Sequence, residues 1–334
     1  MSNKPPIEVP QGAIRLNTDS QRLEFYAQDR WFEMATDVPT LDGGARGFWM
    51  GGARDGTDNI IDFVTIPTAG NATDFGDLTV ARSGTSCVAS ITRGIAGGGY
   101  VAPANKNEID FITIASTGNA LDFGNLNTAS RDGCGVSNST RGLFFLSRTP
   151  SLTDEIDQIT IATTGNAVDF ANQVTATASM GSCESPTRGL AAGGQTPSNV
   201  NTIQFITIAS GGNAQDFGDL ANTQEGGGGA GNAIRGIFAG SQVGPAQTNN
   251  IEFVTIATEG DATDFGDLTQ QTSTPACCSN PTRMVRGGGN AVPGGNTVNI
   301  DYVMIMTRGN AVDFGDLTSS ANAFDAQSNA HGGL

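Results

Sequence analysis

The sequence repeats itself six times with a period of about 47 residues, and this limits the possible folds more than any other feature. Its clearest mark is an Asp-Phe pair, and successive pairs are separated by 48, 47, 47, 48 and 49 residues. The pairs are Asp74 and Phe75, Asp122 and Phe123, Asp169 and Phe170, Asp216 and Phe217, Asp264 and Phe265, and Asp313 and Phe314. A catalytic residue is needed once per active site, so six even copies indicate a structural unit and not the Asp-Phe-Gly of a kinase.

An arginine recurs with the same period and, in five of the six units, is followed by glycine and a short apolar segment. These arginines are Arg46, Arg93, Arg141, Arg188, Arg235 and Arg283. A run of alternating residues follows, such as EIDFITIAS from residue 108, and β-branched and aromatic residues dominate it. With the Asp-Phe segment and a variable Ser- and Cys-containing segment, each unit is expected to form four short strands.

Four strands in about 47 residues predict an all-β protein with a six-bladed β-propeller over residues 41–334, because each propeller blade is a four-stranded sheet. A β-solenoid is the alternative, although its rungs are shorter and its ends need caps. The last residues align with the variable segment and stop as a seventh arginine strand would begin, with His331 in the place of the arginine. The last strand is therefore expected to complete the first blade and close the ring.

Residues 1–40 have a different pattern and predict a small β-meander. The alternating stretches AIRLN, RLEFY and RWFEM are separated by turns at residues 18–20 and 27–29. Such a sheet is too small to be stable alone, so its aromatic side chains need cover from the propeller, from other copies or from a partner. The candidate docking residues are Phe25, Tyr26, Trp31 and Phe32.

We interpret the repeated residues as structural, with each arginine bonding an aspartate or a carbonyl of its own or a neighbouring blade. Asn71, Asp74 and Asp77 have the oxygen chemistry of a calcium site, but the third unit replaces the equivalent residues. Four of the five cysteines lie 11 to 13 residues after the Phe of their units, which favours buried packing over disulfides or zinc. No catalytic, cofactor or metal site is therefore expected.

The charge of the chain bears on its partners. Lysine occurs twice and the formal net charge is −16, which argues against binding to nucleic acid or to an anionic membrane surface. No apolar run reaches the roughly 20 residues that cross a bilayer, and the N-terminus lacks the apolar core of a secretory signal. We expect synthesis in a cytoplasm, without membrane insertion or leader-directed export.

Two motifs resemble those of a known group of proteins. The segment from Gly12 to Trp31, GAIRLNTDSQRLEFYAQDRW, resembles a module near the start of many tailed-phage virion proteins. The repeat, as in NTIQFITIASGGNAQDFGDL, is similar to that of structural proteins in marine and cyanobacterial phages, and its glycine-rich strand is similar to that of kelch propellers. The resemblance implies a non-enzymatic virion component, either a tail-fibre or tail-tip protein or a capsid decoration or head-fibre protein. It also implies docking to other virion proteins through the N-terminal module, and a trimer or another symmetric homo-oligomer.

Variable linkers between the arginine strand and the alternating run suggest where a host-surface glycan or protein would bind. They span residues 100–107, 147–154, 195–201, 241–249 and 290–298, and on a propeller they gather on one face. The candidate receptor-loop residues are Tyr100, Lys106, Arg148 and Asp154. Two alternatives stay open at this point: loops without any binding role, and a polysaccharide-binding lectin module, for which Tyr100 is the one aromatic platform in the linkers. A propeller hydrolase or lyase would need one catalytically distinct unit, whereas the acids are spread evenly.

Overall fold

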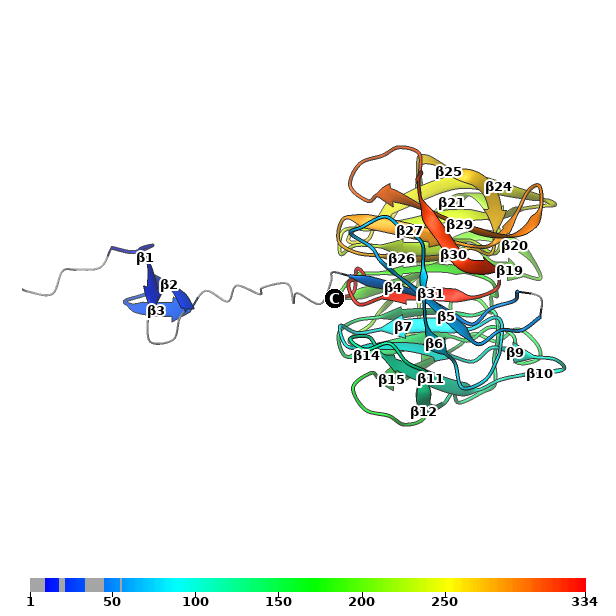
Figure 1. Cartoon of the computed structure of the whole chain (residues 1–334), viewed down its shortest axis with the longest axis horizontal. Helices are drawn as coiled ribbons and strands as arrows, with labels where there is room; N and C mark the ends of the chain where they lie inside the picture. The colour runs from blue at the N-terminus through cyan, green and yellow to red at the C-terminus, as the bar shows by residue number, and fades with distance from the viewer. Residues whose placement is uncertain (1–9, 18–21, 34–44, 55) are drawn as a thin grey trace, which may run out of the picture. The chain divides into compact units, whose positions relative to one another are not determined.

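The computed structural model describes residues 10–17, 22–33, 45–54 and 56–334. The chain divides into two compact units, Met1–Gly44 and Ala45–Leu334. Every regular element among the described residues is a β-strand, as the all-β prediction requires, and the strands form several antiparallel sheets (Figure 1).

The first unit contains a three-stranded antiparallel meander of β1 (Ile14–Asn17), β2 (Arg22–Ala27) and β3 (Arg30–Glu33). Gln28 and Asp29 connect β2 to β3 with φ angles of 50° and 56°, the left-handed conformation that a tight two-residue hairpin needs. The turn expected at residues 18–20 lies outside the described residues.

The described part of the second unit contains six four-stranded antiparallel sets with the same strand order. Set 1 is β31 (Asp325–Ser328), β4 (Arg46–Met50), β5 (Ile60–Thr65) and β6 (Thr73–Asp77); set 2 is β7 (Ser86–Ala89), β8 (Arg93–Gly97), β11 (Glu108–Thr113) and β12 (Leu121–Asn125). Set 3 is β13 (Cys134–Ser137), β14 (Arg141–Phe145), β15 (Glu155–Thr160) and β16 (Val168–Asn172); set 4 is β17 (Gly181–Glu184), β18 (Arg188–Ala192), β20 (Ser198–Thr207) and β21 (Gln215–Gln224). Set 5 is β22 (Gly228–Gly231), β23 (Arg235–Val243), β24 (Ala246–Thr255) and β25 (Thr263–Ser273); set 6 is β26 (Ala276–Ser279), β27 (Arg283–Gly287), β29 (Gly295–Met304) and β30 (Val312–Ala321).

The first strand of each set is the variable Ser- and Cys-containing segment, which pairs with the arginine strand that follows it. In set 1 this strand is β31, from the far end of the chain, so the last strand completes the first set as expected. The expected place of His331 is wrong by one residue. Ser328 lies opposite Gly47 as Ser279 lies opposite Met284, so Gly332 takes the arginine position.

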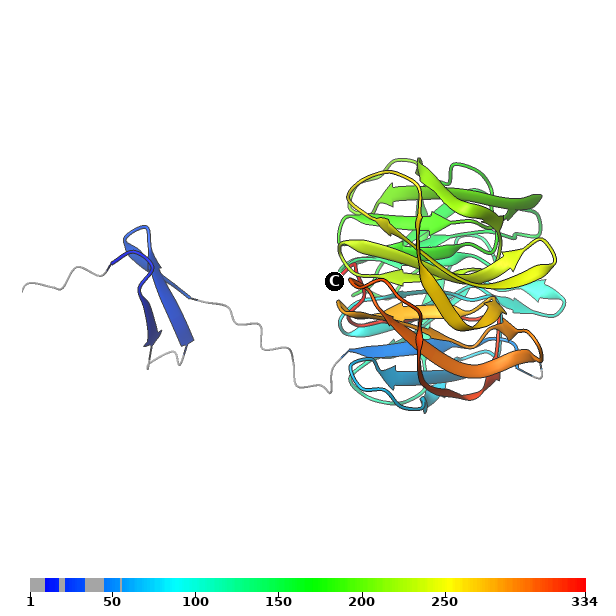
Figure 2. The same ribbon diagram turned by 90° about the horizontal axis from the view of Figure 1, so that it is seen from above.

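Short strands extend the loops between the second and third strands of the sets. They are β9 (Tyr100–Val101), β10 (Ala104–Asn105), β19 (Gln195–Thr196) and β28 (Asn290–Ala291). β28 joins β25 to β29, so sets 5 and 6 form one nine-stranded sheet. Within Ala45–Leu334, β9, β10 and β19 lie at the opposite side from the C-terminus and the start of β4 (Figures 1 and 2). We call the side with β9, β10 and β19 the loop face.

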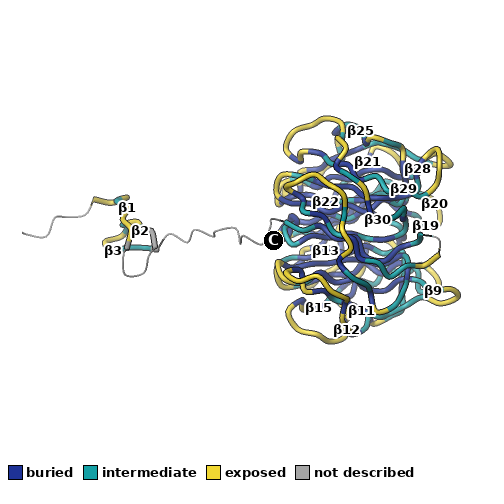
Figure 3. The backbone as a smooth tube through the Cα atoms, viewed as in Figure 1, coloured by how far each residue is buried: buried dark blue, intermediate teal, exposed yellow. Residues whose placement is uncertain are grey.

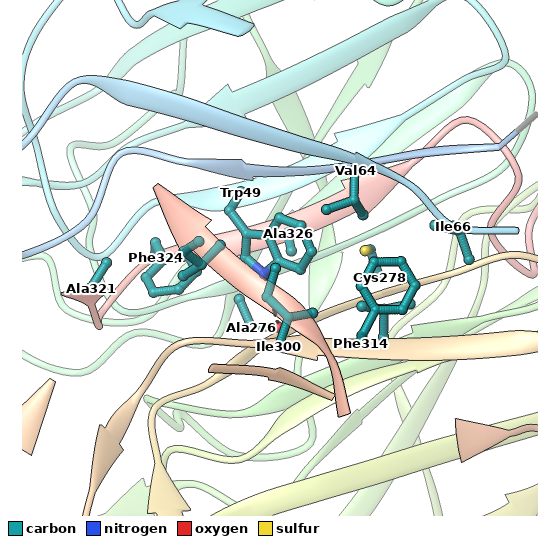
Figure 4. Close-up of a cluster of buried hydrophobic side chains, with 12 residues drawn as sticks. Trp49, Val64, Ile66, Ala276, Cys278, Ile300, Phe314, Ala321, Phe324 and Ala326 are labelled. Carbon is teal, nitrogen blue, oxygen red and sulfur yellow. Dashed lines mark hydrogen bonds between the residues drawn. The ribbon is translucent and has the colours of Figure 1, made fainter. Parts of the chain in front are cut away.

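The described core is divided into six apolar clusters, and each combines side chains of two successive sets. Buried residues follow the strands in the interior of Ala45–Leu334, and exposed residues lie mainly in the connections at its outside (Figure 3). The cluster in Figure 4 joins set 6 to set 1, because Trp49 and Val64 pack with Cys278, Ile300 and Phe314. The Trp49 indole N–H also donates to the Ala276 carbonyl at 3.1 Å. Apolar contacts between the faces of neighbouring sheets therefore hold the sets together.

The Phe of each Asp-Phe pair anchors one of these clusters. Phe217 is 3% exposed and meets the ring of Phe205 edge-on at 6.0 Å. Phe170 is only half-buried, and Gln158 stands in its set at the position that Phe205 has in set 4. We expect Phe217→Ala to lower the free energy of unfolding by about 3–5 kcal/mol and Phe170→Ala by clearly less. Urea unfolding of both variants measures this, and equal losses would contradict the packing described here.

Candidate functional site

The six repeated arginines link each set to the next. Each donates from Nη1 to a backbone carbonyl just beyond the third strand of the following set, at 2.6–3.1 Å. The bonds run from Arg46 to Ile114, Arg93 to Ile161, Arg141 to Ile208, Arg188 to Ile256, Arg235 to Ile305, and Arg283 to Ile66. The last bond returns from set 6 to set 1. The sequence analysis named an aspartate or a carbonyl as the partner of each arginine, and the structure shows carbonyl partners in these six bonds.

The aspartates of the Asp-Phe pairs are exposed. The Asp74 carboxylate accepts the Gly76 N–H at 3.1 Å. The glycine after the Phe has a steric reason, because a Cβ on Gly76 would lie 2.4 Å from the Gly118 carbonyl oxygen of set 2. Ala171 stands at this position in set 3, the one unit that departs from the motif.

One of the candidate calcium residues, Asn71, caps a strand of the neighbouring set. Asn71 accepts the backbone N–H of Asp316 at 3.1 Å, and the equivalent side chain accepts in the same way at every other junction. The other bonds join Asp77 to Asn119, Asn125 to Asn166, Asn172 to Asn213, Asp219 to Asp261, and Asp267 to Asn310. Among the described residues, no group of three or more His, Cys, Asp or Glu side chains is arranged to hold a metal ion.

Sequence reasoning missed a ring of buried polar side chains on the third strands. They are Asp62, Asp110, Asp157, Gln204, Glu252 and Asp301, and each accepts a hydrogen bond from the preceding set at 2.6–3.4 Å. Three arginines from three unrelated positions neutralise part of the ring: Arg54 pairs with Asp62, Arg82 with Asp110, and Arg286 with Asp301. The available signal was the Asp, Gln or Glu that recurs at one equivalent position of all six alternating runs.

The candidate docking residues lie on both faces of the N-terminal meander. Phe25 and Phe32 are paired across β2 and β3 and stack at 5.4 Å, while Tyr26 and Trp31 form the next pair at 5.2 Å and therefore point to the other face. Ile14, which is 64% exposed, lies opposite Phe25 and extends the first pair. The meander thus has one apolar face that includes residues the sequence analysis did not select.

A groove on the loop face is lined by one of the four candidate receptor residues, Tyr100. Its volume is about 410 Å³, and it lies between the loops of sets 2 and 3. Its lining residues include Tyr100, Pro103, Asn105, Arg131, Thr149 and Pro150. The Arg131 guanidinium carbon lies 4.1 Å from the centre of the Tyr100 ring, and Arg148 forms a backbone bridge with Arg131. We call this the Tyr100–Arg131 groove.

Asp132 is the counter-ion of both arginines in this region. Its Oδ2 lies 3.5 Å from Nε of Arg131 and 3.4 Å from Nε of Arg148. Burial raises the pKa of Asp132, and the two arginines oppose this shift. Asp132 has φ 58°, a left-handed conformation that is uncommon outside glycine but tolerated by aspartate. Two guanidinium groups on one carboxylate leave a local excess of positive charge.

Three of the candidate receptor residues, Lys106, Arg148 and Asp154, do not line the Tyr100–Arg131 groove. Lys106 lies 3.7 Å from the Glu108 carboxylate, and the Asp154 backbone carbonyl accepts the Gln173 N–H, so both belong to the support of their loops. Arg131 was missed by the sequence analysis because it lies in the connection before set 3, outside the variable linkers.

The C-terminal residues cross the face opposite the loop face. His331 is 3% exposed; its Nδ1 lies 2.5 Å from the Glu184 carboxylate, and its Nε2 lies 3.1 Å from the Ala89 carbonyl. Gln327 donates to the same carboxylate at 3.0 Å. The chain end therefore connects strands of sets 1, 2 and 4.

The first strands of all six sets begin around a cavity of about 90 Å³. Asp325 lines this cavity, and its carboxylate accepts the N–H groups of Cys87 at 2.6 Å and Ala326 at 2.8 Å. Burial raises the pKa of Asp325 from 3.8 to about 7 despite these two hydrogen bonds. The five free cysteines are also buried, and all five lie on the first strands, in the packing role that the sequence predicted for four of them.

The raised pKa of Asp325 predicts a pH dependence of stability. The folded protein binds more protons than the unfolded chain between pH 4 and 7, so the free energy of unfolding falls as pH rises through this range. Asp157, with a pKa raised to about 6 by burial, acts in the same direction. The loss due to Asp325 is at most about 4 kcal/mol. Urea titrations at pH 5, 6, 7 and 8 measure the slope, and Asp325→Asn should flatten it; a slope unchanged in that variant would contradict the assignment.

No known family model matches the chain, and a search of curated proteins finds no match. The described residues include no helix with the length and apolarity needed to span a bilayer.

Proposed function

We propose that the protein is a non-enzymatic structural component of a tailed-phage virion, of the tail-fibre or tail-tip type. In this proposal Ala45–Leu334 is a six-bladed, kelch-like β-propeller that the virion displays for attachment to the host surface. The two sequence motifs described above motivate the viral assignment.

The contacts between sets support the propeller. Three kinds of hydrogen bond and one apolar cluster recur at each junction, including the junction from set 6 back to set 1. β31 also pairs with β4, so two segments far apart in sequence share one sheet. A β-solenoid would leave its first and last units unjoined, and these contacts argue against that alternative.

One observation carries the attachment role: the loops that contain β9, β10 and β19, whose sequences differ between units, lie on the loop face, whereas the repeated arginines and the capping side chains hold the sets together. The Tyr100–Arg131 groove is the clearest case. Within Ala45–Leu334, the start of β4 and the C-terminus lie on the side opposite the loop face (Figure 1).

The N-terminal meander is proposed to join the protein to other virion proteins and to further copies of itself in a symmetric homo-oligomer. Ile14, Leu16 and Phe25 support this role, because they are 64%, 60% and 37% exposed on one face of a three-stranded sheet. The remaining interior of the small sheet is too limited to stabilise it alone.

Mass spectrometry of density-purified phage particles tests the proposal. We expect peptides of this protein in the particles at a stoichiometry typical of fibres, and its presence only in the soluble lysate would contradict a virion role. A capsid decoration or head-fibre protein is the alternative position in the particle. Incubation with host polysaccharide should release no sugar, and released sugar would indicate an enzyme.

A further inference from the structure

We propose that the Tyr100–Arg131 groove binds a carboxylate-bearing sugar, such as a hexuronic acid residue of a surface polysaccharide. This inference rests on the proposed attachment role and names the ligand class for it. It also develops the lectin alternative, in which the recognised feature is an acidic group and not an aromatic platform alone.

The first argument is that one equivalent position of the repeat carries two like charges in set 3 and in no other set. Each set has a bridge between the connection that precedes its first strand and the loop after its second strand. The bridging pairs are Asn322 and Ala53, Ser83 and Tyr100, Arg131 and Arg148, Ala178 and Gln195, Glu225 and Gln242, and Ser273 and Asn290. Only the Arg131–Arg148 bridge places like charges opposite each other, an arrangement that is unfavourable for stability. A bound anionic ligand would neutralise the two arginines and remove this repulsion.

The second argument is the number of free donors. Among the described residues, the terminal nitrogens Nη1 and Nη2 of Arg131 make no hydrogen bond, and its buried Nε lacks a hydrogen-bond partner of good geometry. Arg148 directs Nη2 to the Gln195 side-chain oxygen at 2.7 Å and shares Asp132. The Tyr100 ring holds the Arg131 plane from one side, which fixes the planar fork that matches a carboxylate.

The third argument is the mixed lining of the groove. Pro103, Ala104 and Pro150 provide apolar surface for the C–H face of a sugar ring, and Asn105, Thr128 and Thr149 provide polar groups for its hydroxyls. The volume of about 410 Å³ is in the range of small-ligand sites. A free phosphate would use the arginine and none of these walls. The formal charge of −16 repels polyanions at long range, so recognition of an acid requires this local positive site.

Isothermal titration of the full-length protein tests the inference. The probes are a glucuronate-containing oligosaccharide, its neutral glucose counterpart and inorganic phosphate. We expect the acidic sugar to bind at least ten times more tightly than the other two, and Arg131→Gln to weaken its binding about 10- to 100-fold, the effect of losing a charged hydrogen bond. Arg308→Gln is the matched control, because Arg308 also lies over an aromatic ring, Phe253 at 4.7 Å, but outside the groove, and it should leave binding unchanged.

Several results would overturn the inference: equal binding of neutral and acidic sugars, binding of phosphate as tight as that of the acidic sugar, no binding of the acidic sugar, or full binding by Arg131→Gln. Thermal unfolding of Arg131→Gln should show an unchanged or raised midpoint, since a like-charge contact is removed. With such a midpoint, weaker binding by this variant reflects the lost guanidinium group and not a loss of fold. The virion assay separates this inference from the proposed function. A virion protein without acidic-sugar binding overturns only the inference, whereas acidic-sugar binding by a protein absent from particles overturns only the virion role.

Discussion

Deleting residues 325–334 should abolish the cooperative fold of the second unit. The deletion removes β31, exposes the edge of β4, and uncovers Trp49, which is 1% exposed in the intact chain. It also removes the bonds of His331 and Gln327 to Glu184. The expected loss is comparable with the whole stability of a typical domain, about 5–15 kcal/mol.

Circular dichroism during urea titration and size-exclusion chromatography measure the effect of this deletion. A variant that lacks residues 2–9 is the control, since it loses a similar number of residues that precede the described part of the chain. We expect the control to unfold like the intact protein and the C-terminal deletion to aggregate or to unfold without a transition. A deletion variant with an intact transition would show that the sixth and first sets are not joined through β31.

Replacing Arg286 by methionine should lower the free energy of unfolding by about 3–5 kcal/mol, since it leaves the Asp301 carboxylate buried without its cation. The two side chains are 0% exposed, and Nη2 of Arg286 lies 2.7 Å from Oδ2 of Asp301. Thr269 would still donate to Asp301, but a neutral donor compensates a buried charge only in part.

Urea unfolding of Arg286→Met measures this cost, and Arg308→Met is the control at an exposed arginine, with an expected change within about 0.5 kcal/mol. The double variant Arg286→Met/Asp301→Asn should recover part of the loss because the uncompensated charge is gone. A loss below about 1 kcal/mol in the single variant would mean that water or another cation reaches Asp301.

The repeat made much of the fold predictable. Its period, its β-branched runs and the extra strand segment at the C-terminus predicted the four-stranded sets and the pairing of β31 with β4, since these depend on local pattern and on chain order. The place of His331 was wrong by one residue because register depends on strand pairing, which the repeat alone leaves open.

The sites were less predictable because they depend on side chains from different parts of the repeat. Arg82 comes from a variable connection and reaches Asp110 in a third strand, so no spacing rule identifies the pair. Tyr100 and Arg148 were selected from their loops, but the charge arrangement needs Arg131 and Asp132 from the connection between the sets. Lys106 and Asp154 lie in the same kind of loop and do not line the groove. Sequence variation in a loop is thus weaker evidence for a binding site than a difference in charge between equivalent residues of the repeat.

Immunogold electron microscopy of purified particles, with antibodies to Ala45–Leu334, tests the central claim most directly. The account predicts gold at the tail fibres or the tail tip. Intact particles without any label, beside label on free protein in the same lysate, would contradict it.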